Sequence, residues 1–293
     1  MTSFWSLWII ILTTACVGLV TWILLVTNRE ETTGETTGHE YDGIEEYDNP
    51  MPSWWFKMFI ATIVFAVAYV ILYPGMGSFK GVLGWTQINQ WQAEKETGEA
   101  LFLEQAKVYL EQPAADLVEN QGALRMGGRL FKSNCSSCHG SNGQGNYAFP
   151  NLTDNVWLYG GTEEKIKETI TKGRNGAMPA WGAMLGSDID AMAAYVKSLN
   201  SEETRKDAEN NPMHAKFQML CSTCHGKDAQ GSQLVGAPNL TNDNWLYGGS
   251  LAEIKLTLDQ GRNGVMPAHE KLLSKERIHL LTAYVMSLSH VPE

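Results

Sequence analysis

Two short motifs of the same spacing constrain this 293-residue chain more than any other feature. The first is Cys135-Ser-Ser-Cys138-His139, and the second, 86 residues later, is Cys221-Ser-Thr-Cys224-His225. On one short helical turn, the two thiols can reach the two vinyl groups on one edge of a porphyrin, and the histidine can reach its iron. The spacing therefore predicts two covalently bound haem c groups, each attached through one cysteine pair and ligated by its histidine.

Zinc knuckles and dithiol redox pairs use similar cysteine spacings and are the alternatives. A structural zinc needs four matched ligands at each site. A thioredoxin-like pair is expected in a βαβ pattern. The haem interpretation is favoured because the motif occurs twice, each time inside a repeated context. The fifth cysteine, Cys16, lies in an apolar run and is interpreted as an inert packing residue.

The sequence around the two motifs also repeats, which predicts two tandem domains of one fold. The matched segments are Pro150–Thr153 with Pro238–Thr241, Trp157–Gly161 with Trp245–Gly249, Gly173–Pro179 with Gly261–Pro267, and Tyr195–Leu199 with Tyr284–Leu288. We expect cytochrome domains over 122–200 and 213–293, joined by a charged linker over 201–212. Domains of about 80 residues have small cores, so we expect each to depend on its haem.

Apolar residues at helical spacing predict that both domains are mainly helical. Helices are expected before each motif (about 121–134 and 212–220), after each Gly-Gly pair, and at the end of each copy (about 188–199 and 275–288). Ser250 and Glu253 have the spacing of a capping box at the start of one of them. This is the pattern of a small class I cytochrome c.

A methionine is predicted as the sixth iron ligand in both domains. Met178 and Met266 occupy equivalent places in a Gly-rich loop, each followed by proline and roughly 40 residues after its haem histidine. The other methionines lack this paired context, and the remaining candidate histidines of this region have no counterpart in the other copy; they are His214, His269, His279 and His290. From the residues alone, each methionine can serve either its own domain or the other one.

Further residues of the repeats have softer interpretations. The carbonyls of Pro150 and Pro238 are expected to accept a hydrogen bond from the haem histidine and so orient its ring. Arg174 and Arg262 are expected to pair with haem propionates. The aromatic residues expected to line the pockets are Trp157, Tyr159, Trp245 and Tyr247. A turn, a surface charge and a core aromatic are the respective alternatives.

Two apolar runs predict transmembrane helices. Phe4–Val26 has no charged residue, and Trp54–Tyr73 carries only Lys57, near one end. The ranges expected are 1–28 for the first helix, 29–53 for a polar loop and 54–76 for the second helix. A cleaved signal peptide is disfavoured because the first 28 residues contain no lysine or arginine. Neither run contains a histidine, so their side chains offer no ligand for a membrane-embedded haem b.

Covalent haem attachment takes place outside the bacterial cytoplasm, which sets the expected topology. Both haem domains and the N-terminus should then be periplasmic, with residues 29–53 cytoplasmic, in a protein of the inner membrane. Residues 77–121 should form a periplasmic linker with a helix from about 93 to 111, because Pro113 prevents its continuation. From 113 to 293 there are 19 acidic and 17 basic residues and no basic patch, so nucleic acid is not an expected partner.

A more specific signature lies between the two apolar runs and just after them. The stretch Tyr41-Asp-Gly-Ile-Glu-Glu-Tyr-Asp-Asn-Pro-Met-Pro-Ser-Trp-Trp55 and the segment Tyr73–Trp85 resemble the CcoP (FixP) family, the dihaem subunits of cbb3-type cytochrome c oxidases. The resemblance extends from Tyr41 to the C-terminus. One departure is the leading apolar run, since many members of the family have a single anchor.

The resemblance implies a role in electron transport within the respiratory chain. Electrons would pass from a soluble or membrane-bound donor cytochrome c through the two haems. They would continue to a monohaem subunit and to the catalytic haem–copper subunit, which reduces oxygen and pumps protons. The resemblance also implies crossed ligation, with His139 and Met266 on the first iron and with His225 and Met178 on the second.

Taken together, the sequence predicts an all-α protein with two transmembrane helices followed by two tandem class I cytochrome c domains. Two six-coordinate irons leave no open position for oxygen or peroxide, so the chain is expected to have no catalytic site of its own and to act as a component of an oxidase complex. The alternatives are a free-standing membrane-anchored dihaem cytochrome, a dihaem peroxidase and a haem-based ligand sensor.

Overall fold

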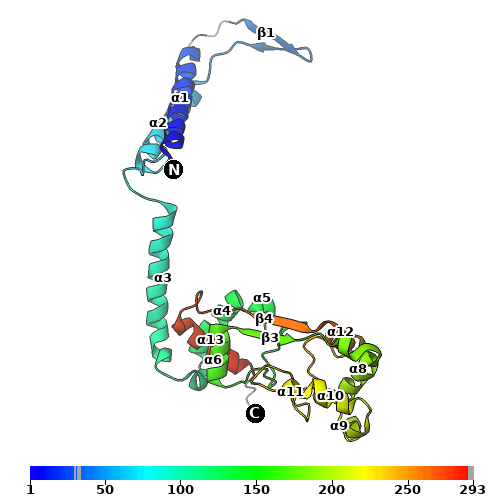
Figure 1. Ribbon diagram of the computed structural model, residues 1–293. Coiled ribbons are helices and arrows are strands. Elements are labelled where there is room, and N and C mark those ends of the chain that lie inside the picture. Colours follow the sequence, from blue (N-terminus) through cyan, green and yellow to red (C-terminus); the bar gives the residue numbers. More distant parts are fainter. Residues whose placement is uncertain (30, 32–33, 290–293) are drawn as a thin grey trace. The chain divides into compact units, whose positions relative to one another are not determined.

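The protein is represented by a computed structural model that describes residues 1–29, 31 and 34–289. It forms two compact units, Met1–Leu101 and Phe102–Glu293, and helix α3 (Gln87–Leu110) runs across the boundary (Figure 1). Helices dominate both units, and the only strands among the described residues form two short two-stranded ribbons. The all-α prediction is therefore confirmed for the described part of the chain.

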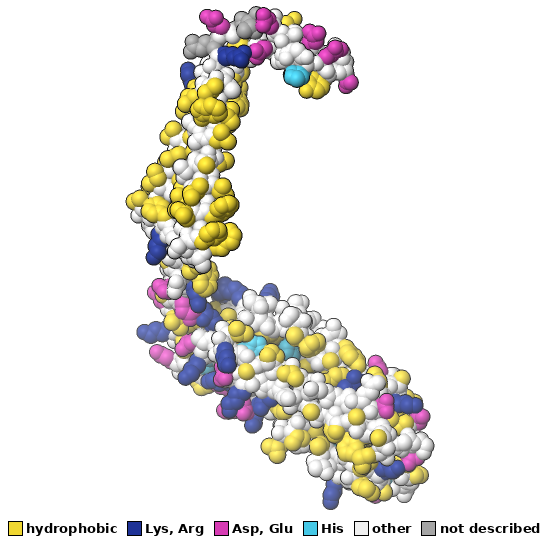
Figure 2. All heavy atoms as spheres, turned by 45° about the horizontal axis from the view of Figure 1, so that its top comes forward, with side chains coloured by type: hydrophobic (Ala, Val, Ile, Leu, Met, Phe, Trp, Pro, Cys, Tyr) yellow, Lys and Arg dark blue, Asp and Glu magenta, His cyan; other side chains and the backbone are white. Residues whose placement is uncertain are grey.

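Two apolar helices dominate the first unit. Helices α1 (Ser3–Thr27) and α2 (Ser53–Leu72) are long and apolar enough to cross a membrane, as predicted. They lie side by side, and the backbone N–H of Ser78, just beyond α2, donates to Ser6 Oγ at 2.8 Å. Most of their large apolar side chains are exposed in the isolated chain (Figure 2), as expected for helices that contact lipid or other subunits.

The segment between these helices forms a hairpin, whereas the sequence suggested only a polar tether. Strands β1 (Thr36–Tyr41) and β2 (Ile44–Tyr47) pair antiparallel, with Tyr41 opposite Ile44. The turn consists of Asp42 and Gly43, which both have positive φ, at 53° and 82°. An Asp-Gly pair is a strong signal for such a two-residue turn, so the hairpin was predictable from these two residues.

The chain turns back on itself after α2 and then starts α3. The N–H groups of Val82 and Leu83 donate to the carbonyls of Ile71 and Leu72, and so satisfy groups that the helix end leaves unpaired. Helix α3 starts at Gln87, six residues before the expected start at 93, because Thr86 caps it through reciprocal hydrogen bonds with Asn89. It ends at Leu110, ahead of Pro113, as predicted.

The second unit contains the repeated elements. In the first repeat these are α4 (Gln121–Asn134), α5 (Ser136–His139), α6 (Glu163–Lys172), β3 (Arg174–Met178), α7 (Gly182–Leu185) and α8 (Ile189–Ser198). After α9 (Glu202–Arg205), the second repeat has α10 (His214–Leu220), α11 (Ser222–His225), α12 (Leu251–Gln260), β4 (Arg262–Met266) and α13 (Lys275–Ser289). The predicted capping box at Ser250 and Glu253 is present at the start of α12.

The two hydrophobic cores of this unit each combine residues from both repeats. The first-motif core contains Phe131, Ile166 and Ile170 of the first repeat with Leu273, Ile278, Leu281 and Val285 of the second. The second-motif core contains Phe217, Ile254 and Leu258 of the second repeat with Leu185, Met192, Ala193, Tyr195, Val196 and Leu199 of the first. Helix α13 packs on α4 and α6, and α8 packs on α12. The packed cores therefore cut across the ranges 122–200 and 213–293, which follow the sequence repeat.

A third cluster connects the end of α3 to the first-motif side of the unit. It contains Ala106, Ala114, Leu117, Ala123, Met126, Leu280 and Ala283. Helices α4 and α13 cross closely here, since a Cβ on Gly127 would lie 2.5 Å from the carbonyl oxygen of Leu280. The C-terminal helix of the second repeat is thus held against both the first repeat and α3.

The exchange of helices takes place at a two-stranded ribbon. Strands β3 and β4 pair antiparallel, with Gly176 opposite Gly264 and with each arginine opposite the other strand's methionine. The sequence suggested Gly-rich loops here. No local sequence signal marks these strands, because the hydrogen-bonding partner of each strand is the equivalent strand of the other repeat.

Candidate functional site

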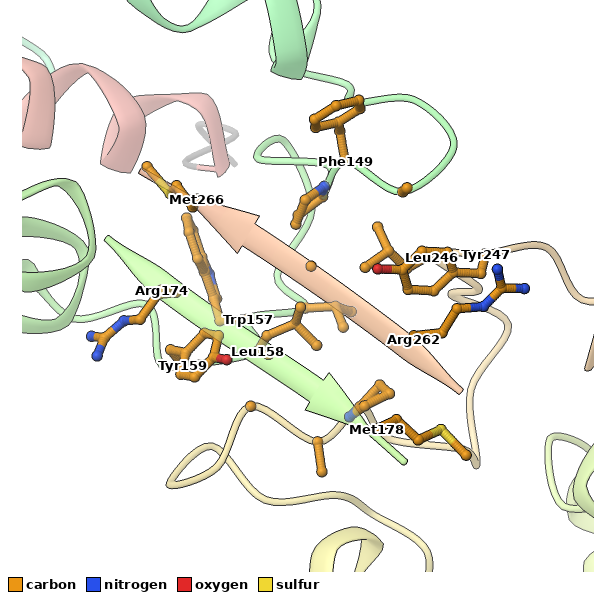
Figure 3. A pocket seen from close by; sticks show the side chains of 18 of the residues that line it. Phe149, Trp157, Leu158, Tyr159, Arg174, Met178, Leu246, Tyr247, Arg262 and Met266 are labelled. Carbon is orange, nitrogen blue, oxygen red and sulfur yellow. The ribbon is translucent and has the colours of Figure 1, made fainter. Parts of the chain in front are cut away.

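Both motifs open onto one cavity of about 670 Å³. The ribbon β3–β4 runs across it, and Figure 3 shows Met178 and Met266 at opposite ends of the ribbon, with Trp157, Tyr159, Leu246 and Tyr247 around it. All four aromatic residues expected from the sequence, Trp157, Tyr159, Trp245 and Tyr247, line the cavity. The volume lies in the usual range for protein ligand sites.

The two motifs form single helical turns with matched geometry. In α5 and α11 the second cysteine, Cys138 or Cys224, is exposed, whereas Cys135 and Cys221 are half-buried against the two cores. All four cysteines line the cavity, and none of them is paired in a disulfide among the described residues. Among the described residues, no three His, Cys, Asp or Glu side chains meet in a cluster that could hold a metal ion directly. The motifs thus lack the four-ligand set of a structural zinc site.

The two histidines are oriented as metal ligands. His139 and His225 are 9% and 8% exposed, and their Nδ1 atoms lie 3.0 Å from the carbonyl oxygens of Pro150 and Pro238, as the sequence suggested. A carbonyl only accepts, so Nδ1 carries the proton, and Nε2 keeps its lone pair for a metal. Gly145 permits the contact in the first motif, because a Cβ there would lie 2.7 Å from the Pro150 oxygen.

Burial sets the protonation of the side chains at these motifs. It raises the pKa of the Cys135 and Cys221 thiols to about 11, and the neighbouring Cys138 and Cys224 add to the shift. Burial also lowers the pKa of His139 and of His225 below the ordinary value. Both imidazoles are therefore neutral at pH 7, the form in which histidine binds a metal.

The cavity also contains donors that lack acceptors, which tests whether a haem fits. Four buried polar atoms that line it have no hydrogen-bond partner among the described residues: Tyr159 Oη, Trp245 Nε1, Arg262 Nη2 and His269 Nδ1. Each can donate a hydrogen bond, and buried donors are rarely left unpaired. A ligand with an apolar body and anionic acceptors satisfies this lining. Haem, with its two propionates, has that chemistry.

The candidate methionine ligands lie in opposite cores. Met266 packs against the first-motif core, which also includes Cys135. Met178 packs against the second-motif core, which includes Cys221. Each methionine is the last residue of its own strand, and it packs against the core that contains the first cysteine of the other repeat's motif.

The competing histidines have different surroundings. His214 Nδ1 lies 2.9 Å from Tyr195 Oη, and His279, whose Nε2 is buried without a hydrogen-bond partner, does not line the cavity. His269 does line it, and its charge affects the pKa of His139. His290 lies outside the described residues.

Two threonines of the site were missed from the sequence. The Nε atoms of Arg174 and Arg262 donate to Thr169 Oγ1 and Thr257 Oγ1, both at 2.9 Å. A threonine precedes each arginine by five residues in both repeats, which was the available signal. These bonds fix the two guanidinium groups at the edge of the cavity.

Comparison with protein families agrees with this geometry. Residues 33–80 match the family described as the N-terminal domain of cytochrome oxidase-cbb3, FixP. Residues 122–196 and 208–285 each match the family described as cytochrome c oxidase, cbb3-type, subunit III. The two matches of the second family coincide with the two repeats.

Several curated proteins are similar over most of their length. A Cbb3-type cytochrome c oxidase subunit CcoP of Rubrivivax gelatinosus is 42% identical over 98% of this chain and 95% of the relative. A subunit FixP of Azorhizobium caulinodans is 38% identical over 86% of this chain and 92% of the relative. A subunit CcoP of Azospirillum brasilense is 38% identical over 87% and 95% of the respective chains.

Proposed function

Since this chain belongs to the CcoP/FixP family of cbb3-type cytochrome c oxidase subunits, we propose that it transfers electrons into the oxygen-reducing complex. It carries two haem c groups and receives electrons from a donor cytochrome c. It delivers them towards the monohaem subunit and then the catalytic haem–copper subunit. The observation that carries this proposal is the single cavity reached by both cysteine motifs, because it brings the two haem sites together.

The proposed iron ligands are crossed between the repeats. His139 and Met266 ligate the haem attached through Cys135 and Cys138, and His225 and Met178 ligate the haem attached through Cys221 and Cys224. The packing of Met266 against the first-motif core and of Met178 against the second-motif core supports this pairing. Histidine–methionine ligation favours a high reduction potential.

The protein's own side chains bind and protect the cofactors. The cysteine pairs Cys135/Cys138 and Cys221/Cys224 would hold the two haems through thioether links to their vinyl groups. The proline carbonyls orient the imidazoles, burial keeps the imidazoles neutral, and the half-buried aromatic side chains limit the access of water. A haem bound at each site would supply one-electron redox chemistry.

The membrane topology is part of the proposal. Helices α1 and α2 anchor the protein in the bacterial inner membrane, with both cytochrome domains in the periplasm and the hairpin β1–β2 in the cytoplasm. The apolar surfaces of α1 and α2 support the anchoring role. Covalent haem attachment outside the cytoplasm supports the orientation.

Purification of the full chain from native membranes tests the assembly. We expect two covalently bound haems per chain and comigration with a haem–copper subunit and a monohaem cytochrome. A chain with two haems that migrates without any oxidase subunit would instead be a free-standing dihaem cytochrome. A high-spin haem in the resting spectrum would revive the peroxidase alternative.

Single-haem variants test the crossed ligation. Cys221→Ser with Cys224→Ser leaves one haem, on the first motif. In this background, Met266→Ala should abolish the absorption band of methionine-ligated ferric haem, while Met178→Ala should preserve it. The opposite result would assign each methionine to its own repeat.

A further inference from the structure

The two arginines of the cavity have almost identical supports. Each donates its Nε proton to a threonine of the preceding helix. The guanidinium carbons lie 4.9 Å and 4.5 Å from the ring centroids of Tyr159 and Tyr247. Figure 3 shows the two Arg–Tyr pairs on opposite sides of the ribbon. The two proposed haem sites therefore share the same Arg–Thr hydrogen bond and the same Arg–Tyr contact.

The sites differ in what lies six residues before each arginine. In the first repeat this residue is Glu168, and its Oε2 accepts from Arg174 Nη2 at 3.1 Å. Arg174 is also the main reason why the pKa of Glu168 is lowered. In the second repeat the equivalent residue is Leu256, which offers no charge. Arg262 Nη2 is buried and has no hydrogen-bond partner among the described residues.

One described carboxylate, that of Glu253, interacts electrostatically with Arg262 but is already engaged elsewhere. Glu253 Oε2 accepts from the backbone N–H and the hydroxyl of Ser250, in the capping box of α12. Its remaining interaction with Arg262 is a minor electrostatic effect on its pKa. The positive charge of Arg262 is thus largely uncompensated, and its Nη2 remains a free donor inside the cavity.

We propose that Arg262 binds a propionate of the haem attached to Cys221 and Cys224, and that Leu256 makes this possible by leaving Arg262 without a counter-charge. Arg174, paired with Glu168, is not free to act in the same way. The two haems therefore have unequal reduction potentials, and the haem of the second motif has the higher one. This inference rests on the proposed haem sites.

The direction follows from charge. Oxidised haem carries one more positive charge than reduced haem, so a nearby uncompensated cation favours the reduced form and raises the potential. Lys165 and Lys172 surround Glu168, but their side chains are 55% and 70% exposed. Water and salt screen such charges, so the partly buried arginines decide the difference.

A redox titration of the full-length holoprotein, followed by visible absorption, tests the inference. It is performed at about pH 8, where an ordinary imidazole is neutral. Two separate one-electron steps are expected in the wild type. Leu256→Glu installs the missing carboxylate and should lower the higher-potential step. Glu168→Leu removes the existing one and should raise the lower-potential step.

Matched variants control for the charge itself. Leu251→Glu and Glu164→Leu make the same changes on the same helices, at exposed positions that form no hydrogen bond or ion pair with either arginine in the described part of the chain. Their shifts should be clearly smaller than those of Leu256→Glu and Glu168→Leu. Equal shifts, or a shift of the lower step by Leu256→Glu, would overturn the inference.

A second pair of variants keeps the test decisive if Leu256→Glu does not bind haem. Arg262→Gln should lower the higher step more than Arg174→Gln lowers the other, because the proposal places only Arg262 in contact with a haem propionate, whereas Arg174 Nη2 is bonded to Glu168. Equal or reversed effects contradict the inference. Fewer than two haems per wild-type chain would remove the proposed function itself, whereas two haems with unmoved potentials would reject only the role of Arg262.

Discussion

The first and second repeats of the haem-binding unit use the same elements but complete one another. The first repeat supplies α4 and α6 to the first-motif core, and its last helix, α8, belongs to the second-motif core. The second repeat does the reverse with α13. In this protein, the segment that repeats in the sequence is therefore different from the set of residues that pack into one core. A substitution in one repeat should therefore alter the stability and ligation of the haem attached to the other repeat.

Separation of the repeats should have the largest effect. A chain that ends at Arg205 lacks α13 and Met266, so the first-motif core loses four of its buried residues: Leu273, Ile278, Leu281 and Val285. We expect complete loss of methionine-ligated haem from this fragment, measured by absorption of the purified product. Coexpression of residues 206–293 as a second chain should restore it. A fragment that binds methionine-ligated haem by itself would contradict the exchange.

Truncation of a single core side chain should have the next largest effect. Leu281→Ala removes a fully buried side chain of α13 and should lower the free energy of unfolding by about 2–5 kcal/mol. The haem of the first motif should lose its methionine ligand first, although Leu281 belongs to the second repeat. Stepwise denaturation followed at both haems measures this, with Val196→Ala in α8 as the reciprocal variant. Earlier loss at the second motif in Leu281→Ala would refute the exchange.

The close crossing of α4 and α13 offers a smaller test. Gly127→Ala should cost about 1–3 kcal/mol, because the new Cβ would press on the Leu280 carbonyl. Gly98→Ala, on the exposed surface of α3 with no atom nearby, should leave stability unchanged or raise it by up to about 1 kcal/mol. Denaturant unfolding of the two variants separates the contact from helix propensity. A gain for Gly127→Ala would mean that the helices do not pack here.

The smallest expected effect concerns the ion pair that only the first repeat has. Arg174 lowers the pKa of Glu168, so the pair stabilises the folded state above the ordinary glutamate pKa and stops doing so as the pH falls through the lowered value. Glu168→Gln should therefore slightly lower the unfolding midpoint at pH 7, but not at about pH 3. Leu256→Gln should show no such pH dependence. A difference that persists at low pH would show that packing, not charge, is responsible.

Local elements of this fold were predictable, because their signals lie within a few residues. Helix α4 has the expected limits, and Ser250 and Glu253 correctly marked the start of α12. The hairpin β1–β2 was missed despite Asp42-Gly43. For the site, both histidine–proline contacts and the aromatic lining were predicted and are present.

Long-range features could not be derived in the same way. The ribbon β3–β4 joins segments 88 residues apart, and the two copies are so alike that own-repeat and crossed packing use the same side chains. The difference between Glu168 and Leu256 is visible in the aligned repeats. Its meaning depends on the burial of Arg262 Nη2, which no pattern of residues reveals.

The pairing of Gly176 with Gly264 at the centre of the ribbon has an evolutionary consequence. A duplicated gene is normally free to lose one copy or to let it drift. Here each repeat supplies part of the core that holds the other motif, so deletion of either repeat is expected to disable both sites. The duplication is therefore difficult to reverse, although single positions outside the shared cores, such as Glu168 and Leu256, can still diverge independently.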